Sequence, residues 1–146
     1  MKKKEVLDTL KLDQILIDES FRRLVEGICC LKFEDHDYAW DLFDKAARAV
    51  REHIKIEEEG LLDKVAIEEA TVMRSEHRNL IELLEEARYA LREKRAVSFK
   101  VLIAALKTAM IEHERIESHL FRSLELTEFS HDILASLQRR IANRIV

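Results

Sequence analysis

Glycine and proline are almost absent from this chain, and no other feature of the sequence limits the fold so strongly. The 146 residues include two glycines, Gly27 and Gly60, and no proline. Average usage is about 7% for glycine and 5% for proline, and the tight turns of all-β proteins depend on them. The composition therefore excludes a β-sandwich or barrel and a disordered or collagen-like chain. It also excludes a glycine-rich phosphate-binding loop.

Charged and hydrophobic residues are interspersed along the chain. They make up 37% and 47% of it, the mixture expected of amphipathic helices. The 25 basic and 29 acidic residues give a formal net charge of -4. Because there is no clustered positive excess, we expect no nucleic-acid partner and no binding to an anionic membrane. Every apolar stretch is shorter than the roughly 18 residues of a transmembrane helix, so no such helix is expected.

The cellular compartment is predicted from the cysteines and from the beginning of the chain. Cys29 and Cys30 are the two cysteines, and adjacent thiols do not build an ordinary disulfide framework. The basic start at Lys2 is not followed by the apolar stretch of a signal peptide. These features indicate a reducing compartment, and we expect a cytoplasmic protein.

Apolar residues recur at three- and four-residue steps in four long segments that polar clusters separate. We predict helices over residues 4–31, 37–63, 67–93 and 98–124. Four such helices with short links predict an all-α, up-down-up-down four-helix bundle over residues 1–125. A shorter additional helix is predicted within the C-terminal residues 126–146. It is expected to pack on the bundle or on a partner subunit, so a homodimer stays open.

Histidine and glutamate fall on the apolar stripes of the second and fourth predicted helices. His53 and Glu57 form one H-x-x-x-E pair, and His113 and Glu117 form another. A spacing of four residues puts both side chains of a pair on one helix face, one turn apart. His77 also faces inward, on the third predicted helix. Because these residues lie at similar distances from the predicted turns, an antiparallel bundle brings all five to one level.

Buried polar residues of these types are typical of a metal site. Burying carboxylates and imidazoles without compensation costs several kcal/mol each. A coordinated cation removes that cost. Imidazole combined with carboxylate suits iron, manganese or zinc, whereas calcium and magnesium prefer oxygen ligands alone. The sequence therefore predicts a buried transition-metal site.

The first predicted helix carries no histidine at this level, so its ligand is sought in a weak internal repeat. The two H-x-x-x-E pairs are about 60 residues apart, and nearly the same offset aligns His77 with Asp18. Asp18 is therefore the candidate ligand from this helix. Glu19 lies further from the apolar centre, whereas Asp13 and Gln14 face inward better but break the repeat. These three residues, or no ligand at all, stay open as alternatives.

Three blocks of sequence together resemble the hemerythrin-like (HHE cation-binding) family over about residues 8–125. The blocks read HIKIEEEGLL (residues 53–62), SEHRNLIELL (residues 75–84) and HERIESHLF (residues 113–121). The family signature is a histidine on helix one, H-x-x-x-E on helix two, a histidine on helix three, and H-x-x-x-E or H-x-x-x-x-D on helix four.

The resemblance implies a non-haem di-iron centre inside a four-helix bundle. Glu57 and Glu117 would bridge two iron ions, and His53, His77 and His113 would be terminal ligands, with manganese or zinc as other occupants. The chain departs from the family because helix one lacks its histidine and Met73 stands where oxygen carriers have a second histidine on helix three. The resulting site is more anionic than that of an oxygen carrier.

The resemblance and its departures together favour oxidation chemistry or sensing over reversible oxygen carriage. We expect a protein that binds, senses or reduces oxygen or peroxide, with weak catalase- or oxidase-like turnover as its enzymatic form. The alternatives are an iron- or oxygen-responsive regulatory module without turnover and a metal-free structural bundle.

Overall fold

The computed structural model describes residues 3–30, 36–62, 65–122, 135 and 139. Four helices and no strand occupy this part of the chain: α1 (Lys3–Cys30), α2 (His36–Gly60), α3 (Ile67–Arg92) and α4 (Ala96–Arg122). The prediction of an all-α four-helix bundle is confirmed. The predicted fifth helix within residues 126–146 lies outside the described residues, apart from two single positions.

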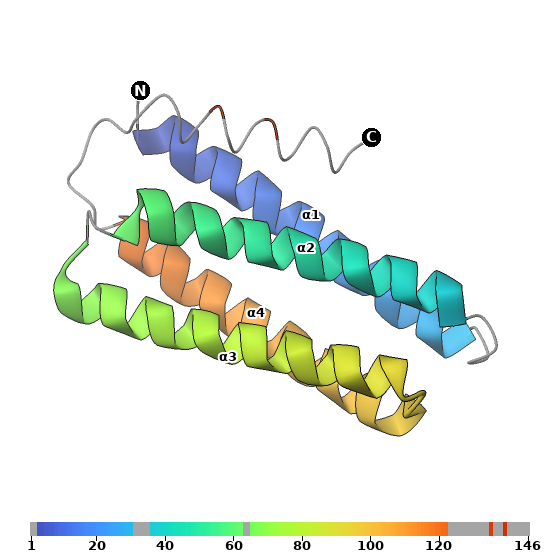
Figure 1. The fold of residues 1–146 in the computed structure, drawn as a ribbon. Helices are drawn as coiled ribbons and strands as arrows, with labels where there is room; N and C mark the ends of the chain where they lie inside the picture. Colours follow the sequence, from blue (N-terminus) through green and yellow to red (C-terminus); the bar gives the residue numbers. More distant parts are fainter. Residues whose placement is uncertain (1–2, 31–35, 63–64, 123–134, 136–138, 140–146) are drawn as a thin grey trace.

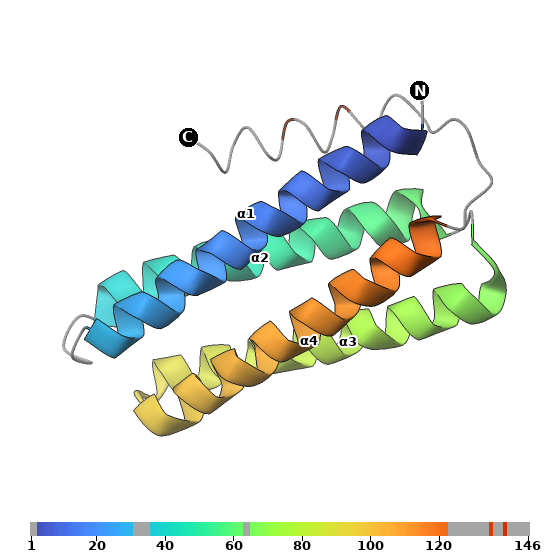
Figure 2. The same ribbon diagram turned by 180° about the vertical axis from the view of Figure 1, so that it is seen from behind.

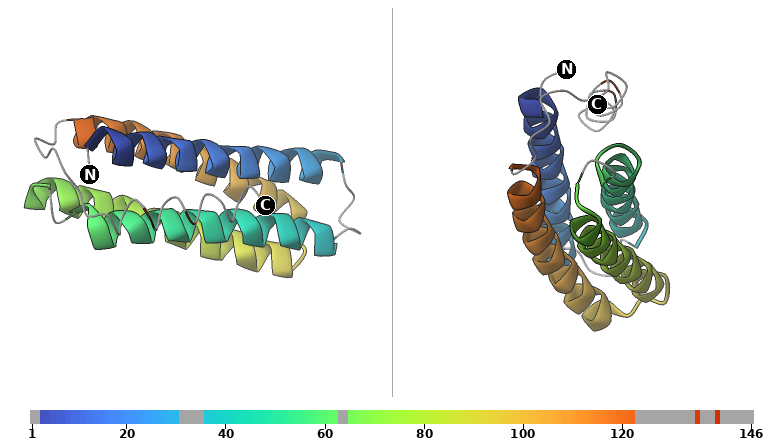
Figure 3. Two further views of the ribbon diagram at one scale, coloured as in Figure 1. Left: turned by 90° about the horizontal axis from the view of Figure 1, so that it is seen from above. Right: turned by 90° about the vertical axis from the view of Figure 1, so that its left-hand side faces the viewer.

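Successive helices run in opposite directions, as the up-down-up-down prediction requires (Figure 1; Figure 2). α1 and α4 form one layer of the bundle, and α2 and α3 form the other (Figure 3). Each helix therefore packs mainly against two neighbours, in the pairs α1–α2, α2–α3, α3–α4 and α1–α4. Residues far apart in the sequence meet between the layers.

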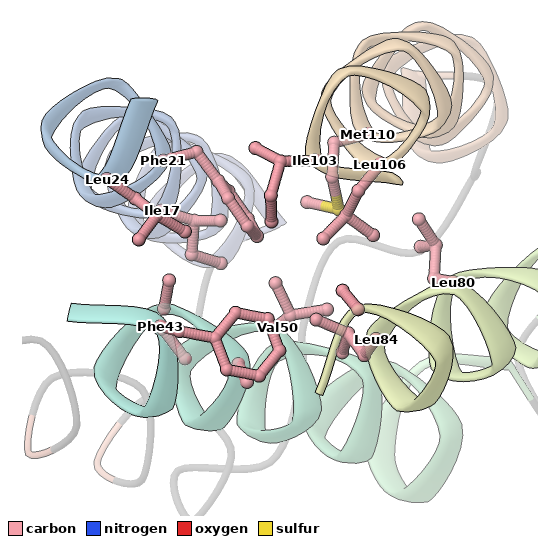
Figure 4. Close-up of a cluster of buried hydrophobic side chains, with 14 of the residues drawn as sticks. Ile17, Phe21, Leu24, Phe43, Val50, Leu80, Leu84, Ile103, Leu106 and Met110 are labelled. Atoms are coloured by element: carbon pink, nitrogen blue, oxygen red, sulfur yellow. The ribbon is translucent and has the colours of Figure 1, made fainter. Parts of the chain in front are cut away.

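The larger apolar cluster fills the half of the bundle nearest the α1–α2 and α3–α4 connections, and every helix contributes to it. Ile17 and Phe21 of α1 and Leu106 and Met110 of α4 point into the space between the two layers (Figure 4). Phe43 of α2 is fully buried, and its ring packs edge-on against Phe99 at a centroid distance of 5.8 Å. Burial of apolar side chains on this scale is the main driving force for closing the bundle.

A second, smaller apolar cluster fills the other half of the bundle. Its buried members come from all four helices and from the end of α2: Leu10, Ile56, Leu61, Leu62, Ala70, Met73 and Leu120. α2 ends at Gly60, earlier than the predicted residue 63, because glycine is a poor helix former. Leu61 and Leu62 then enter this cluster directly instead of continuing the helix.

The turn between α3 and α4 sets the relative height of these two helices. Residues 92–95 are exposed. Lys94 has a φ of 56°, and the N–H groups of Lys94 and Arg95 donate to the carbonyls of Leu91 (3.1 Å) and Ala90 (2.8 Å). These are the two hydrogen bonds of a Schellman C-cap. The cap makes the connection short, so α4 begins at Ala96 instead of the predicted residue 98.

None of the described helices has both the length and the apolar character of a membrane-spanning helix.

Candidate metal centre

A layer of polar side chains lies between the two apolar clusters. It contains the five residues that the sequence singled out on three helices: His53 and Glu57 of α2, His77 of α3, and His113 and Glu117 of α4. Glu117 is 7% exposed, and the other four are at most 1% exposed. The structure thus brings these five residues together in the interior, at one level of the bundle.

Four of these residues satisfy the distance requirement for a shared cation. One nitrogen or oxygen atom from each of His53, Glu57, His113 and Glu117 lies within 4.8 Å of the others. This spacing suits a group of ligands that surrounds one metal ion, because metal–ligand distances are about 2 Å. The geometry can therefore hold a metal ion, and the distances do not identify which metal.

The Nε2 atoms of all three histidines converge on Glu57. Oε1 of this glutamate lies 2.5 Å from His53 Nε2 and 3.4 Å from His113 Nε2, whereas Oε2 lies 3.2 Å from His77 Nε2. Glu117 Oε2 adds contacts of 3.1 Å to His53 Nε2 and 3.3 Å to His113 Nε2. The centre of the polar layer is therefore an array of three ring nitrogens facing two carboxylates.

The Nδ1 atom on the opposite side of two of these rings also faces a carboxylate. His53 Nδ1 lies 2.6 Å from Asp13 Oδ2, and His77 Nδ1 lies 3.0 Å from Glu58 Oε1. An ionised carboxylate only accepts hydrogen bonds, so each ring nitrogen is the donor.

The third histidine also has a carboxylate beside its Nδ1 atom, but no hydrogen bond joins them. His113 Nδ1 lies 3.5 Å from Glu76 Oε1, an ion-pair distance, and neither atom has a hydrogen-bond partner among the described residues. Neither Glu58 nor Glu76 is marked by its sequence pattern as part of a site. The Glu58 side chain is 39% exposed and still contacts His77.

The carboxylates that face the Nδ1 atoms (Asp13, Glu58 and Glu76) are called the outer carboxylates below. Each lies on a different helix from the histidine that it faces, so the sequence alone does not pair them. Helical periodicity reports which face of one helix is buried, but it does not report which neighbouring residue meets that face. A usable signal was the adjacency of Glu58 to Glu57 and of Glu76 to His77.

The electrostatics of the centre favour protonated imidazoles when only protein groups are present. Burial opposes charge on His53, but the negative charges of Glu57 and Glu117 outweigh it and raise the pKa of His53 to about 10. Burial likewise opposes charge on His113, but the contacts of its imidazole with the carboxylates of Glu117, Glu57 and Glu76 outweigh it and raise the pKa of His113 to about 11.

The central carboxylate shifts in the opposite direction. Burial acts to raise the pKa of Glu57, but the charge of His53 and hydrogen bonds from all three histidines prevail and hold it well below its ordinary value. Glu57 is therefore ionised, and the cluster forms a balanced array of cations and anions.

The structure does not bring Asp18 into this group of potential ligands. Asp18 is half-buried, and its Oδ1 accepts a long hydrogen bond of 3.4 Å from Gln14 Nε2. Burial raises the pKa of Asp18, and the Asp18 charge in turn helps burial to raise the pKa of Glu114 on α4. Asp18 therefore lies on the flank of α1 beside α4. The internal repeat also placed the α1 ligand about one turn too far along the helix, because Asp18 follows Ile17 of the larger apolar cluster whereas Asp13 contacts His53.

Other residues of α1 reach the polar layer instead. Asp13 is fully buried against His53. Gln14 is 1% exposed, and its Oε1 atom has no hydrogen-bond partner in the described part of the chain. Glu19, the other alternative, is ion-paired with Arg22 and Arg23 on the exposed face. Of the four α1 candidates, the structure thus buries the two inward-facing alternatives, Asp13 and Gln14.

No known family model matches this chain, and neither a curated protein nor a solved structure matches it. Function is therefore argued from the geometry and chemistry of the site.

Proposed function

We propose that this bundle is a hemerythrin-like metal-binding protein whose buried histidine–glutamate layer holds two non-haem iron ions. One observation carries the proposal: three buried imidazole Nε2 atoms converge on the carboxylates of Glu57 and Glu117. Imidazole nitrogen with carboxylate oxygen is a donor set that iron, manganese and zinc all accept.

The contacts of Glu57 support two ions better than one. Its Oε1 atom faces His53 and His113, whereas its Oε2 atom faces His77. A carboxylate whose two oxygens face different imidazoles is suited to bridge two cations. Glu117 faces His53 and His113 through one oxygen, Oε2, and its role as the second shared carboxylate comes from the resemblance. This assignment agrees with the roles that the sequence resemblance implies.

The contribution of α1 is proposed to come from Gln14 instead of Asp18. The Gln14 Oε1 atom is a buried acceptor for which the described residues provide no donor, and such an atom usually has a partner in a native interior. A cation would satisfy it. Asp13 is engaged with His53 Nδ1 and therefore supports a ligand instead of replacing one.

The surroundings of the site favour a small oxidant as the ligand. When bound, ferrous ions would supply electrons to oxygen or peroxide. The chain's own contribution is to exclude bulk water, because apolar clusters lie on both sides of the polar layer. An anionic set of donors favours the ferric state, so reduction or sensing of an oxidant fits better than reversible oxygen carriage.

Metal content and the absorption spectrum test this proposal. Protein purified aerobically from iron-supplemented cells is expected to contain close to two irons per chain and to show near-ultraviolet oxo-iron absorption. His113→Ala, which removes one converging Nε2 atom, is expected to lose both signals, and His119→Ala is the matched control because His119 is exposed on the same helix. Peroxide and oxygen consumption would then be assayed. Wild-type protein without metal would contradict the proposal.

Proton release on metal binding is a second expected result. His53 and His113, with pKa values near 10 and 11, are protonated at pH 7, and each must lose its Nε2 proton to bind a cation. Glu57 is already ionised and releases none. About two protons should therefore be released, and affinity should strengthen as the pH rises toward 10. Calorimetric titrations in buffers of different ionisation enthalpy measure this number, and enthalpies independent of the buffer would contradict it.

A metal-free structural bundle is the second candidate, and one specific observation favours it. Each ring nitrogen of His53 and His77 faces a carboxylate without any cation, so ion pairs alone can compensate the buried charges. Such a bundle would keep its stability on exposure to a strong chelator. A metal-holding bundle would lose stability, because a ligand that binds only the folded state stabilises it.

A further inference from the structure

We propose that Asp13, Glu58 and Glu76 are positioning residues that hold the three histidines with Nε2 toward the centre. The inference rests on the proposed metal site and extends it to residues that would not touch the metal. Its basis is the set of Nδ1 contacts: hydrogen bonds of 2.6 Å for His53 and 3.0 Å for His77, and an ion-pair contact of 3.5 Å without a hydrogen bond for His113.

The three contacts follow the order of the helices. Asp13 of α1 faces His53 of α2, Glu58 of α2 faces His77 of α3, and Glu76 of α3 faces His113 of α4. Each helix thus supplies the outer carboxylate for the histidine of the next helix. This arrangement gives α1, which has no histidine, a defined part in the centre.

The chemistry of imidazole explains why an outer carboxylate matters. A neutral histidine binds a metal through one ring nitrogen, and a hydrogen bond at the other nitrogen selects the tautomer and fixes the ring orientation. A carboxylate at Nδ1 keeps the proton there and leaves the Nε2 lone pair for the cation. Loss of such a partner typically lowers metal affinity about 10- to 100-fold.

The three pairs differ in burial, which predicts their relative importance. Asp13 and His53 have side chains that are each 1% exposed, and their contact is the shortest of the three. Glu58 and Glu76 have side chains that are 39% and 21% exposed, so water competes with their contacts. Removing the Asp13 carboxylate should therefore weaken metal binding more than removing either of the other two.

The test uses the full chain, with Zn²⁺ alone as a diamagnetic probe. Affinity is measured by competition with a chelator, and the tautomer of each imidazole is read from ¹⁵N ring shifts of the Zn²⁺-loaded protein. We expect Asp13→Ala to lose about 10- to 100-fold in affinity and Glu58→Ala to lose less, each with a changed tautomer at its own histidine. Asp13→Asn, which keeps an acceptor oxygen, should recover most of the affinity.

Matched controls are available on the same helices. Asp8 of α1 and Glu59 of α2 are exposed carboxylates close in sequence to Asp13 and Glu58. Asp8→Ala and Glu59→Ala should leave both affinity and tautomers unchanged. Glu58 lies at the surface, so the Glu58→Ala result stands even if Asp13→Ala does not fold.

Two results would overturn the inference, and they are distinguishable. Wild-type affinity and unchanged tautomers in both Asp13→Ala and Glu58→Ala would reject the positioning role while leaving the metal site in place. A wild-type chain that takes up no Zn²⁺ would reject the metal site and the positioning role together.

Discussion

Replacement of Glu57 by glutamine is expected to abolish metal binding by this bundle. The Glu57 carboxylate contacts the Nε2 atoms of His53, His77 and His113, so no other residue takes part in as many of the central contacts. Glutamine has nearly the same shape but no charge, and its amide nitrogen cannot accept a hydrogen bond or bind a cation. Metal affinity should fall by more than the roughly 100-fold loss that can follow when a hydrogen-bond partner of a metal ligand is removed.

The same substitution should destabilise the metal-free protein. Glu57 is fully buried and ionised, and its removal leaves the charged imidazoles of His53 and His113 with one anion fewer. Breaking a buried ion pair by removing one partner costs about 3–5 kcal/mol. Denaturant unfolding of the chelated protein measures this cost, and titration of the refolded variant measures its metal binding.

Glu59→Gln is the control for this prediction. Glu59 lies two residues away on α2, its side chain is 65% exposed, and its contact with Lys55 is 3.9 Å long. A surface contact of this kind contributes little to stability. Full metal loading by Glu57→Gln, equal to that of Glu59→Gln, would show that the metal does not bind in the histidine–glutamate layer.

Replacement of Phe43 by alanine is expected to have the largest effect on folding among single core changes. Phe43 is fully buried in the larger apolar cluster, where it packs against Phe99 and lies 6.5 Å from Trp40 between ring centroids. Truncation of a buried phenylalanine costs about 3–5 kcal/mol, because it removes apolar burial and leaves a cavity. Urea unfolding monitored by circular dichroism measures the change.

Tyr38→Ala is the matched aromatic control, because Tyr38 lies one turn earlier on α2 and is 54% exposed. It should change the free energy of unfolding by less than about 0.5 kcal/mol. Below its melting temperature, Phe43→Ala should still bind metal, since Phe43 is a member of the apolar cluster and not of the polar layer. A loss of stability as small as that of Tyr38→Ala would contradict the packing described for this cluster.

The fold was largely predictable because each helix carries a long apolar stripe. The residues of these stripes, such as Phe21 on α1 and Leu84 on α3, lie in the core of the structure. Helix ends were less predictable. The positive φ of Lys94 and the end of α2 at Gly60 depend on local capping and packing, which apolar periodicity does not report.

The centre of the candidate site was predictable for a similar reason. A histidine or glutamate in the middle of an apolar stripe must be buried. Its position along the axis of an antiparallel bundle follows from the number of residues that separate it from the turns. His53 and His113 meet for this reason, although about 60 residues separate them. The contribution of α1 was not predictable in this way. Asp18 matched the weak internal repeat, but the buried Asp13 and Gln14 lie about one turn earlier on α1, and Asp13 contacts His53 in the polar layer.

Which carboxylate faces each histidine depends on how neighbouring helices pack against each other. Whether Glu76 faces His113 depends on the distance and rotation between α3 and α4, which the short turn at Lys94 helps to fix. The proposed positioning role therefore links the connections of the bundle to the geometry of its centre.

An anomalous difference map from a crystal of the iron-loaded protein, recorded at the iron absorption edge, would show directly whether the polar layer holds iron. We expect peaks inside the polar layer, between Glu57 and Glu117, with the Nε2 atoms of His53, His77 and His113 turned toward them. A layer without any anomalous peak, in which the histidines keep direct contacts with Glu57 and Glu117, would contradict this expectation and leave a structural bundle held by buried ion pairs.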